Sequence, residues 1–132
     1  MSKFLYLRDR FFLAACALYA VNRLLIKPLA PGSFFGCWGS DLLLIPCAAP
    51  VCLWLERRCG VRRHDEPPRA GEILFLVVLW SGLFELIAPH VIPRATGDGL
   101  DVLAYAAGGL VAWLWWNRAT IRPSRASSAQ PR

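Results

Sequence analysis

Four long apolar blocks constrain this chain more than any other feature. They cover residues 11–30, 38–55, 73–92 and 100–116 of a 132-residue chain. Blocks of about 17–20 residues form roughly 26–30 Å of helix, which is close to the thickness of the hydrocarbon core of a bilayer. Hydrophobic residues make up 56% of the chain, which is more apolar surface than a soluble domain of this length can bury. The sequence therefore predicts an all-α bundle of four transmembrane helices rather than a soluble enzyme.

The charged segments outside these blocks predict the orientation of the bundle. The polar stretch 56–71 is predicted to be a solvated loop, and a disordered tail, 119–132, is predicted to follow a transmembrane domain at 1–118. Twelve of the fifteen Lys and Arg residues lie near the N-terminus, in this loop or from residue 118 onward. Four crossings place these segments on one side, and the positive-inside rule makes that side cytoplasmic. An aromatic belt at this inner interface is predicted from Trp54, Trp113, Trp115 and Trp116.

The cysteines do not form the close pairs that zinc sites commonly use. The five are Cys16, Cys37, Cys47, Cys52 and Cys59. We expect them to have structural roles, and the sequence predicts no metal and no other cofactor. Leu13–Cys16 resembles a bacterial lipobox, but only a few apolar residues precede it and the apolar run continues beyond it. A membrane-spanning helix is therefore favoured over lipidation at Cys16.

Charged residues inside or beside the apolar blocks are the candidate functional residues. A charge near the centre of a membrane helix costs about 2.5–3.5 kcal/mol, so such residues persist when they are paired or hydrated. In the predicted topology they lie in the outer half of the bilayer, and Tyr105 follows the last of them by one helical turn. The predicted polar network or ligand-binding site comprises Arg23, Lys27, Asp41, Glu85, Arg94, Asp98, Asp101 and Tyr105.

Depth and spacing predict an ion pair between the first and third helices. Arg23 and Glu85 each lie about 18 Å above the inner face, from the rise of 1.5 Å per residue. Tyr19, Arg23 and Lys27 repeat every four residues and share one helix face. Two interpretations stay open. The polar residues either fix the order of the helices or form a pocket that opens to the outer leaflet.

Small residues and prolines predict close helix packing. Ala104, Gly108 and Ala112 form a stripe along the last helix that lets a neighbouring helix approach, either within the chain or in a homo-oligomer. Pro46 and Pro50 lie one turn apart on the second helix, where they should bend it and free carbonyl groups.

The order of the polar residues resembles the VanZ-like membrane protein family over residues 20–116. Lys27-Pro28 and the stretch Ser40–Pro46 resemble the earlier part of the family pattern. The later part is matched by Ser81, Glu85, Arg94, Asp98, Asp101-Val102 and Ala107-Gly108. The resemblance implies a bacterial cell-envelope protein. Members of this family are linked to glycopeptide resistance, especially to teicoplanin, without a settled mechanism.

Three function classes follow from these residues. In the first, a non-enzymatic membrane protein of the plasma membrane engages an anionic lipid or a lipid-linked headgroup through Arg23, Lys27 and Arg94. In the second, Glu85 serves an oligomeric proton- or ion-coupled transporter subunit. Catalysis is the least favoured class because the chain carries no recognisable catalytic motif. The basic loop and tail are expected to attract anionic lipids rather than nucleic acid.

Overall fold

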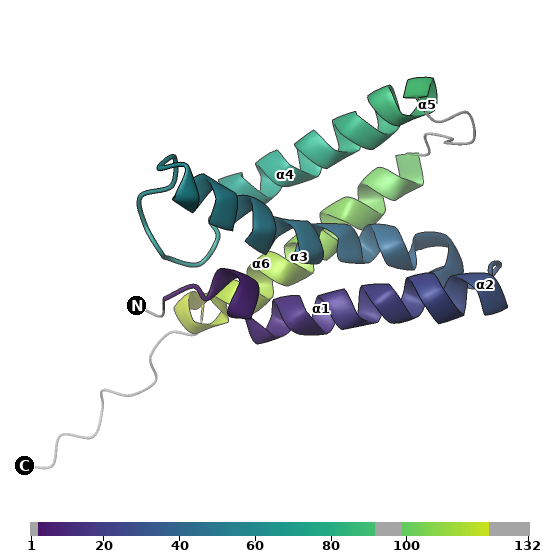
Figure 1. The fold of residues 1–132 in the computed structure, drawn as a ribbon, viewed down its shortest axis with the longest axis horizontal. Helices are drawn as coiled ribbons and strands as arrows, with labels where there is room; N and C mark the ends of the chain where they lie inside the picture. Colours follow the sequence, from purple (N-terminus) through teal and green to yellow (C-terminus); the bar gives the residue numbers. More distant parts are fainter. Residues whose placement is uncertain (1–2, 92–98, 122–132) are drawn as a thin grey trace, which may run out of the picture.

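The described part of the chain folds into four long helical segments, which we call the four rods (Figure 1). The computed structural model describes residues 3–91 and 99–121, and this part contains helices and no strand. The rods cover residues 10–29, 34–58, 70–91 and 99–121. Each is long and apolar enough to cross a membrane. The predicted all-α four-helix fold is therefore confirmed, and its composition is that of a multi-pass membrane protein.

The first and third rods are each built from three elements, of which the middle one is a π-helical turn. In the first rod these elements are α1 (Arg10–Val21), η2 (Asn22–Ile26) and α2 (Lys27–Leu29). In the third rod they are α4 (Ala70–Gly82), η3 (Leu83–Ile87) and α5 (Ala88–Val91).

A proline explains both π-helical turns. Each turn ends two residues before a proline, Pro28 in the first rod and Pro89 in the third. The Lys27 N–H donates to the carbonyl of Asn22, five residues back, and the third rod repeats this bond. Proline has no N–H, and its ring crowds the carbonyl four residues earlier. The helix therefore takes up one extra residue in the turn before the proline, which gives the π-helical hydrogen bond. The charged residues Arg23 and Glu85 both lie in these widened turns.

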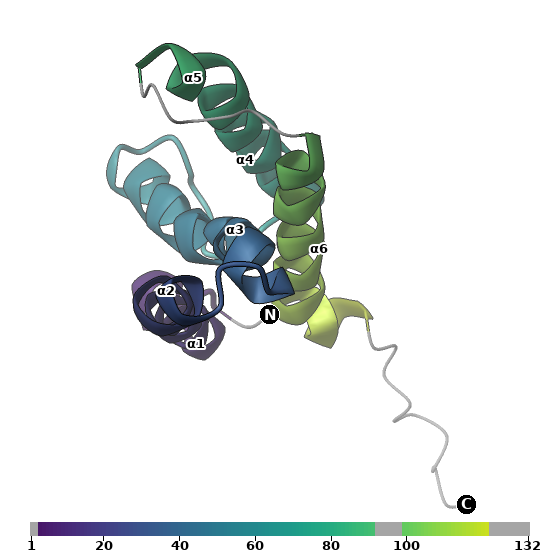
Figure 2. The ribbon, with the colours of Figure 1, turned by 90° about the vertical axis from the view of Figure 1, so that its right-hand side faces the viewer.

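The second rod, α3 (Phe34–Arg58), is the central helix of the bundle. It packs against α1, η2 and α6 (Gly99–Ile121), and more weakly against α4 (Figure 2). The helix begins four residues before the predicted residue 38, because the Ser33 hydroxyl accepts the Gly36 N–H at 3.1 Å and caps its first turn. It continues without a break through Pro46 and Pro50.

Helices α3 and α6 approach each other closely at Gly108. A Cβ atom on Gly108 would overlap the carbonyl oxygen of Leu42 and lie 3.4 Å from the Cδ atom of Pro46. Leu42 lies four residues before Pro46, so its carbonyl lacks the usual helical N–H donor. The Gly108 backbone therefore packs directly on a carbonyl that the proline has freed, in the position of a weak Cα–H···O bond. This confirms that the small-residue stripe lets a neighbouring helix approach closely.

The packing of Gly108 on Leu42 bears on whether the small-residue stripe could join two copies of the chain. Gly108 and Ala112 are buried within the single chain, and Ala104 is half-buried. Gly108 and Ala112 therefore present no exposed surface to a second copy of the chain. Homo-oligomer formation itself stays a prediction.

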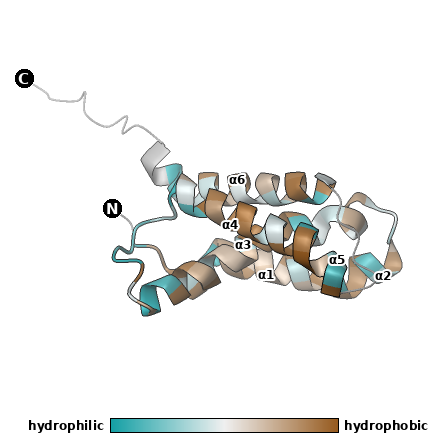
Figure 3. Cartoon of the chain, turned by 90° about the horizontal axis from the view of Figure 1, so that it is seen from above, coloured by the Kyte–Doolittle hydropathy of each residue, from teal (hydrophilic) through white to brown (hydrophobic). Residues whose placement is uncertain are grey.

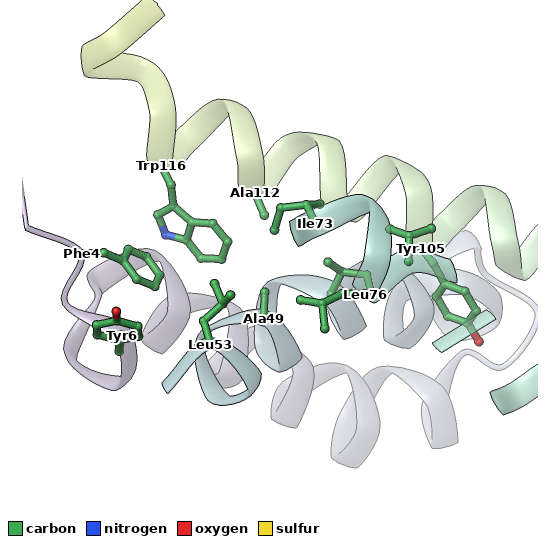
Figure 4. Packing of buried hydrophobic residues seen from close by; sticks show 11 residues of the cluster. Phe4, Tyr6, Ala49, Leu53, Ile73, Leu76, Tyr105, Ala112 and Trp116 are labelled. Carbon is green, nitrogen blue, oxygen red and sulfur yellow. The ribbon is translucent and has the colours of Figure 1, made fainter. Parts of the chain in front are cut away.

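The buried core is a narrow column between α3, α4 and α6 (Figure 4). Ile45, Ala49 and Leu53 of α3 are fully buried, and Leu76 of α4 nearly so. Many large apolar side chains on the outer faces are exposed instead, as expected for helices that face lipid. Hydrophilic residues gather mainly towards the two ends of the bundle (Figure 3).

One end of the bundle, here called the basic end, carries η1 (Tyr6–Arg8), the loop after α3 and the end of α6 (Figure 1). The loop predicted at 56–71 is mostly exposed, as expected, but between the end of α3 and the start of α4 it folds into a cap around the buried side chain of Arg62. The side chain of Arg62 is only 2% exposed, with Nε 3.3 Å from a Glu72 carboxylate oxygen. Arg62 also donates to the Glu66 carbonyl at 2.7 Å. The loop is thus organised around one buried cation.

The N-terminal segment docks onto this cap. Phe4 donates its N–H to the Asp65 carbonyl at 2.7 Å. The Asp65 carboxylate accepts the Tyr6 hydroxyl at 3.0 Å and Arg57 Nε at 2.9 Å. These hydrogen bonds hold the pKa of Asp65 below its ordinary value.

Trp116 differs from its predicted place in an aromatic belt. Its side chain is buried in the core, where Nε1 donates to Asp9 at 2.8 Å and the ring packs edge-on against Phe4. Asp9 also caps α1. Helix α6 continues to Ile121, three residues into the segment predicted as tail, and the rest of that segment lies outside the described residues.

Candidate functional site

The predicted polar residues gather around Asp41, at the end of the bundle opposite to the basic end. Asp41 is half-buried near the start of α3, and its carboxylate interacts with the hydroxyl of Tyr105 from α6. Lys27 and Arg23 are close enough for their charges to act on Asp41, as is Asp101. Glu85 and Asp101 act in the same way on Tyr105. The structure therefore brings six of the eight predicted site residues into one cluster, and we call these six the polar cluster.

The remaining two predicted site residues, Arg94 and Asp98, lie outside the described residues. The other six differ in exposure. Arg23 and Lys27 are exposed, Asp41, Glu85 and Asp101 are half-buried, and Tyr105 is buried. The cations thus lie at the rim of the polar cluster, and the hydroxyl lies at its base.

No ion pair joins Arg23 to Glu85, so the predicted contact was wrong. Between described residues, ion pairs occur only at the basic end of the bundle. Equal depth in the membrane does not make two helices neighbours: α1 and η2 pack on α3, while α4 packs mainly on α6 (Figure 2). Both charges act instead on the Asp41–Tyr105 pair that joins α3 to α6.

Asn22 is a structural residue of this region that the sequence analysis missed. Its side chain is 2% exposed, and Nδ2 donates to the Ser40 hydroxyl at 3.1 Å. Gly39 makes room for it, because a Cβ there would lie only 2.9 Å from the amide. The available signal in the sequence was an Asn within the first apolar block, because a buried amide needs a hydrogen-bond partner. This contact fixes η2 against α3 and so positions Arg23.

An apolar groove of about 280 Å³ lies between α1, α3 and α4. Its floor is one face of α3, and its walls are Tyr19 of α1 and Trp80 of α4. We call it the α1–α4 groove. The α3 residues on its floor are Leu44, Cys47, Ala48, Val51 and Cys52.

Helix periodicity places this groove one turn from the polar cluster, on the side towards the basic end. Tyr19 precedes Arg23 by one turn on α1, and Leu44 follows Asp41 by nearly one turn on α3. On the other wall, the ring of Trp80 stacks on Phe84 with centroids 5.7 Å apart. Phe84 in turn lies 6.3 Å from Tyr105 of the polar cluster.

The charged groups of the polar cluster are of both signs. Within the described ranges, no group of three or more His, Cys, Asp or Glu residues is arranged to hold a metal ion. What the cluster offers is two exposed cations, three carboxylates and a buried hydroxyl within a membrane-spanning bundle.

No family model, curated protein or solved structure matches this chain. The resemblance to the VanZ-like family stays a prediction.

Proposed function

We propose that this chain is a multi-pass protein of the bacterial plasma membrane that engages an anionic lipid or a lipid-linked headgroup at the polar cluster. Both termini would be cytoplasmic, because the basic end carries most of the Lys and Arg residues. The polar cluster would then lie in the outer half of the bilayer. A VanZ-like role in the cell envelope, related to glycopeptide resistance, fits this location.

One observation carries the proposal. Arg23 and Lys27 are exposed on a membrane-spanning rod, and neither forms an ion pair with a described residue. Both cations are close enough for their charges to act on the half-buried carboxylate of Asp41. A cation near the centre of a membrane helix costs about 2.5–3.5 kcal/mol when nothing compensates it, and less towards the helix end. The phosphate of a lipid offers such compensation, and Arg can bind it through two parallel hydrogen bonds.

A lipid-binding measurement tests this proposal. The purified protein in a neutral detergent is titrated with dioleoyl phosphatidylglycerol, or with dioleoyl phosphatidylcholine as the zwitterionic control, and bound lipid is counted by native mass spectrometry. Arg23→Gln and Lys27→Gln each remove a charge from the polar cluster. Arg63→Gln is the matched control, because Arg63 is exposed at the basic end.

The proposal predicts a selective loss. A hydrogen bond to a charged group contributes about 1.5–3 kcal/mol, so Arg23→Gln should weaken phosphatidylglycerol binding about tenfold or more. Arg63→Gln should have little effect. Equal weakening by both variants would mean that only the total charge matters, and the polar cluster would not be a headgroup site.

A second candidate, a proton- or ion-coupled transporter subunit, is favoured by the position of Glu85. This carboxylate lies half-buried in the π-helical turn η3, beside Tyr105 and without an ion pair to a described residue. Such turns are frequent at functional sites. If Glu85 carries protons, proteoliposomes should show a flux driven by a pH gradient that Glu85→Gln abolishes. The absence of any flux across the pH range would exclude this candidate.

A further inference from the structure

We propose that the α1–α4 groove holds a hydrocarbon chain of the lipid whose headgroup meets Arg23 and Lys27. This inference rests on the proposed function and extends it, because it makes the ligand an amphipathic membrane lipid rather than a free anion. The geometry that supports it is the position of the groove about one helical turn from the polar cluster.

The groove has the lining that a hydrocarbon chain requires. Small side chains, Cys47, Ala48 and Cys52, make up most of its floor, while the large rings of Tyr19 and Trp80 form its walls. No charged residue lines it. In a membrane-spanning bundle, such a groove offers a hydrocarbon chain dispersion contacts with its floor and with both walls, away from water.

The two parts of the site are aligned along the helices. On the first rod, Tyr19 lies on the groove wall, and Arg23 and Lys27 follow at intervals of one turn on the same face. On α3, the floor residue Leu44 lies nearly one turn from Asp41. A ligand chain in the groove would therefore lead directly to the two exposed cations.

Aromatic stacking connects the second wall to the base of the polar cluster. Trp80 stacks on Phe84, which contacts the ring of Tyr105. Tyr105 in turn interacts with Asp41. The groove wall at Trp80 and the hydroxyl of Tyr105 therefore belong to one continuous set of packed side chains. A ligand with an apolar chain and an anionic headgroup would match this arrangement.

A substitution that fills the groove tests the inference without touching the polar cluster. Ala48→Phe places a ring on the groove floor. Ala17→Phe is the matched control, because Ala17 is exposed on α1 on the side away from α3. Val51→Trp, at an exposed position of the floor, is a second filling variant if Ala48→Phe does not fold. Helicity and thermal unfolding in detergent establish that each variant is folded.

The probes are dioleoyl phosphatidylglycerol, its soluble dihexanoyl analogue and inorganic phosphate, each measured in the neutral detergent. The native chain should bind the dioleoyl lipid more tightly than either of the other two. Ala48→Phe should weaken binding of the dioleoyl lipid severalfold relative to Ala17→Phe, and it should leave binding of inorganic phosphate unchanged.

The outcomes separate this inference from the proposed function. If Ala48→Phe and Val51→Trp bind the dioleoyl lipid as Ala17→Phe does, while Arg23→Gln binds it weakly, the groove is not a chain site and the headgroup site stands. If all three probes bind the native chain equally, the ligand is a free anion and the inference is wrong. If Arg23→Gln behaves like Arg63→Gln for every probe, the headgroup site itself fails.

Discussion

Substituting Gly108 by alanine tests the close contact between α3 and α6. The new Cβ atom would overlap the carbonyl oxygen of Leu42, which belongs to the backbone of α3 and cannot rotate away. The two helices must then move apart. This movement would loosen the neighbouring contacts of Gly109, whose Cβ position already lies 3.1 Å from Ile73 and Val77 side-chain atoms.

Two opposing effects set the size of the change. Overpacking of a well-packed core costs about 1–3 kcal/mol, and here the crowded atom is backbone, so the upper part of this range applies. Replacing a helical glycine by alanine returns about 1 kcal/mol through helix propensity. We therefore expect Gly108→Ala to lower the free energy of unfolding by about 2 kcal/mol.

The assay is unfolding in mixed micelles by titration with sodium dodecyl sulfate, followed by circular dichroism. Gly82→Ala on α4 is the control, because a Cβ there would meet nothing within 4 Å. This control should be neutral or stabilised by up to about 1 kcal/mol. If Gly108→Ala were as stable as Gly82→Ala, the direct packing of α6 on the Leu42 carbonyl would be refuted.

Two further predictions concern the basic end. Asp9→Ala removes both the cap of α1 and the acceptor of the Trp116 indole, and should cost about 1–2 kcal/mol in the same assay, with Asp9→Asn restoring most of it. Hydrogen bonds from Arg57 and Tyr6 lower the pKa of Asp65, so these contacts stabilise the docked N-terminal segment above about pH 4 and are lost as pH falls through the lowered value. The protection factors of residues 4–9 against amide exchange should therefore fall in acid, and Asp65→Ala should lower them even at neutral pH.

The fold was predictable because hydrophobic block length and helix geometry determine it together. Most differences between the predicted and the observed helices lie at the helix ends. The second rod starts at Phe34 because Ser33 caps it, and the third starts at Ala70, where the Glu72 carboxylate accepts the Arg69 N–H at 2.7 Å. Both caps lie outside the apolar blocks, so hydropathy alone could not locate them.

Candidate residues for the polar cluster could be chosen from the sequence, because charges at membrane depth are costly unless they are paired or hydrated. The way in which these residues pair could not be predicted. Arg23 and Glu85 lie at similar depth, but the order of helices around α3 decides which side chains meet, and a single sequence contains little information on that order. The π-helical turns had a readable signal in Pro28 and Pro89, whose ring and missing N–H disturb the preceding turn.

Labelling of two native cysteines tests most directly whether this bundle crosses a membrane with its polar cluster outside. Cys37 is exposed near the start of α3, and Cys59 is exposed at the basic end. In variants that keep one of the two, with the other cysteines replaced by alanine, intact cells are treated with a membrane-impermeant maleimide. Cys37 should react in intact cells, and Cys59 should react only after the membrane is permeabilised. Equal reaction of both cysteines in intact cells, or the reverse pattern, would contradict the proposed topology and the outer location of the headgroup site.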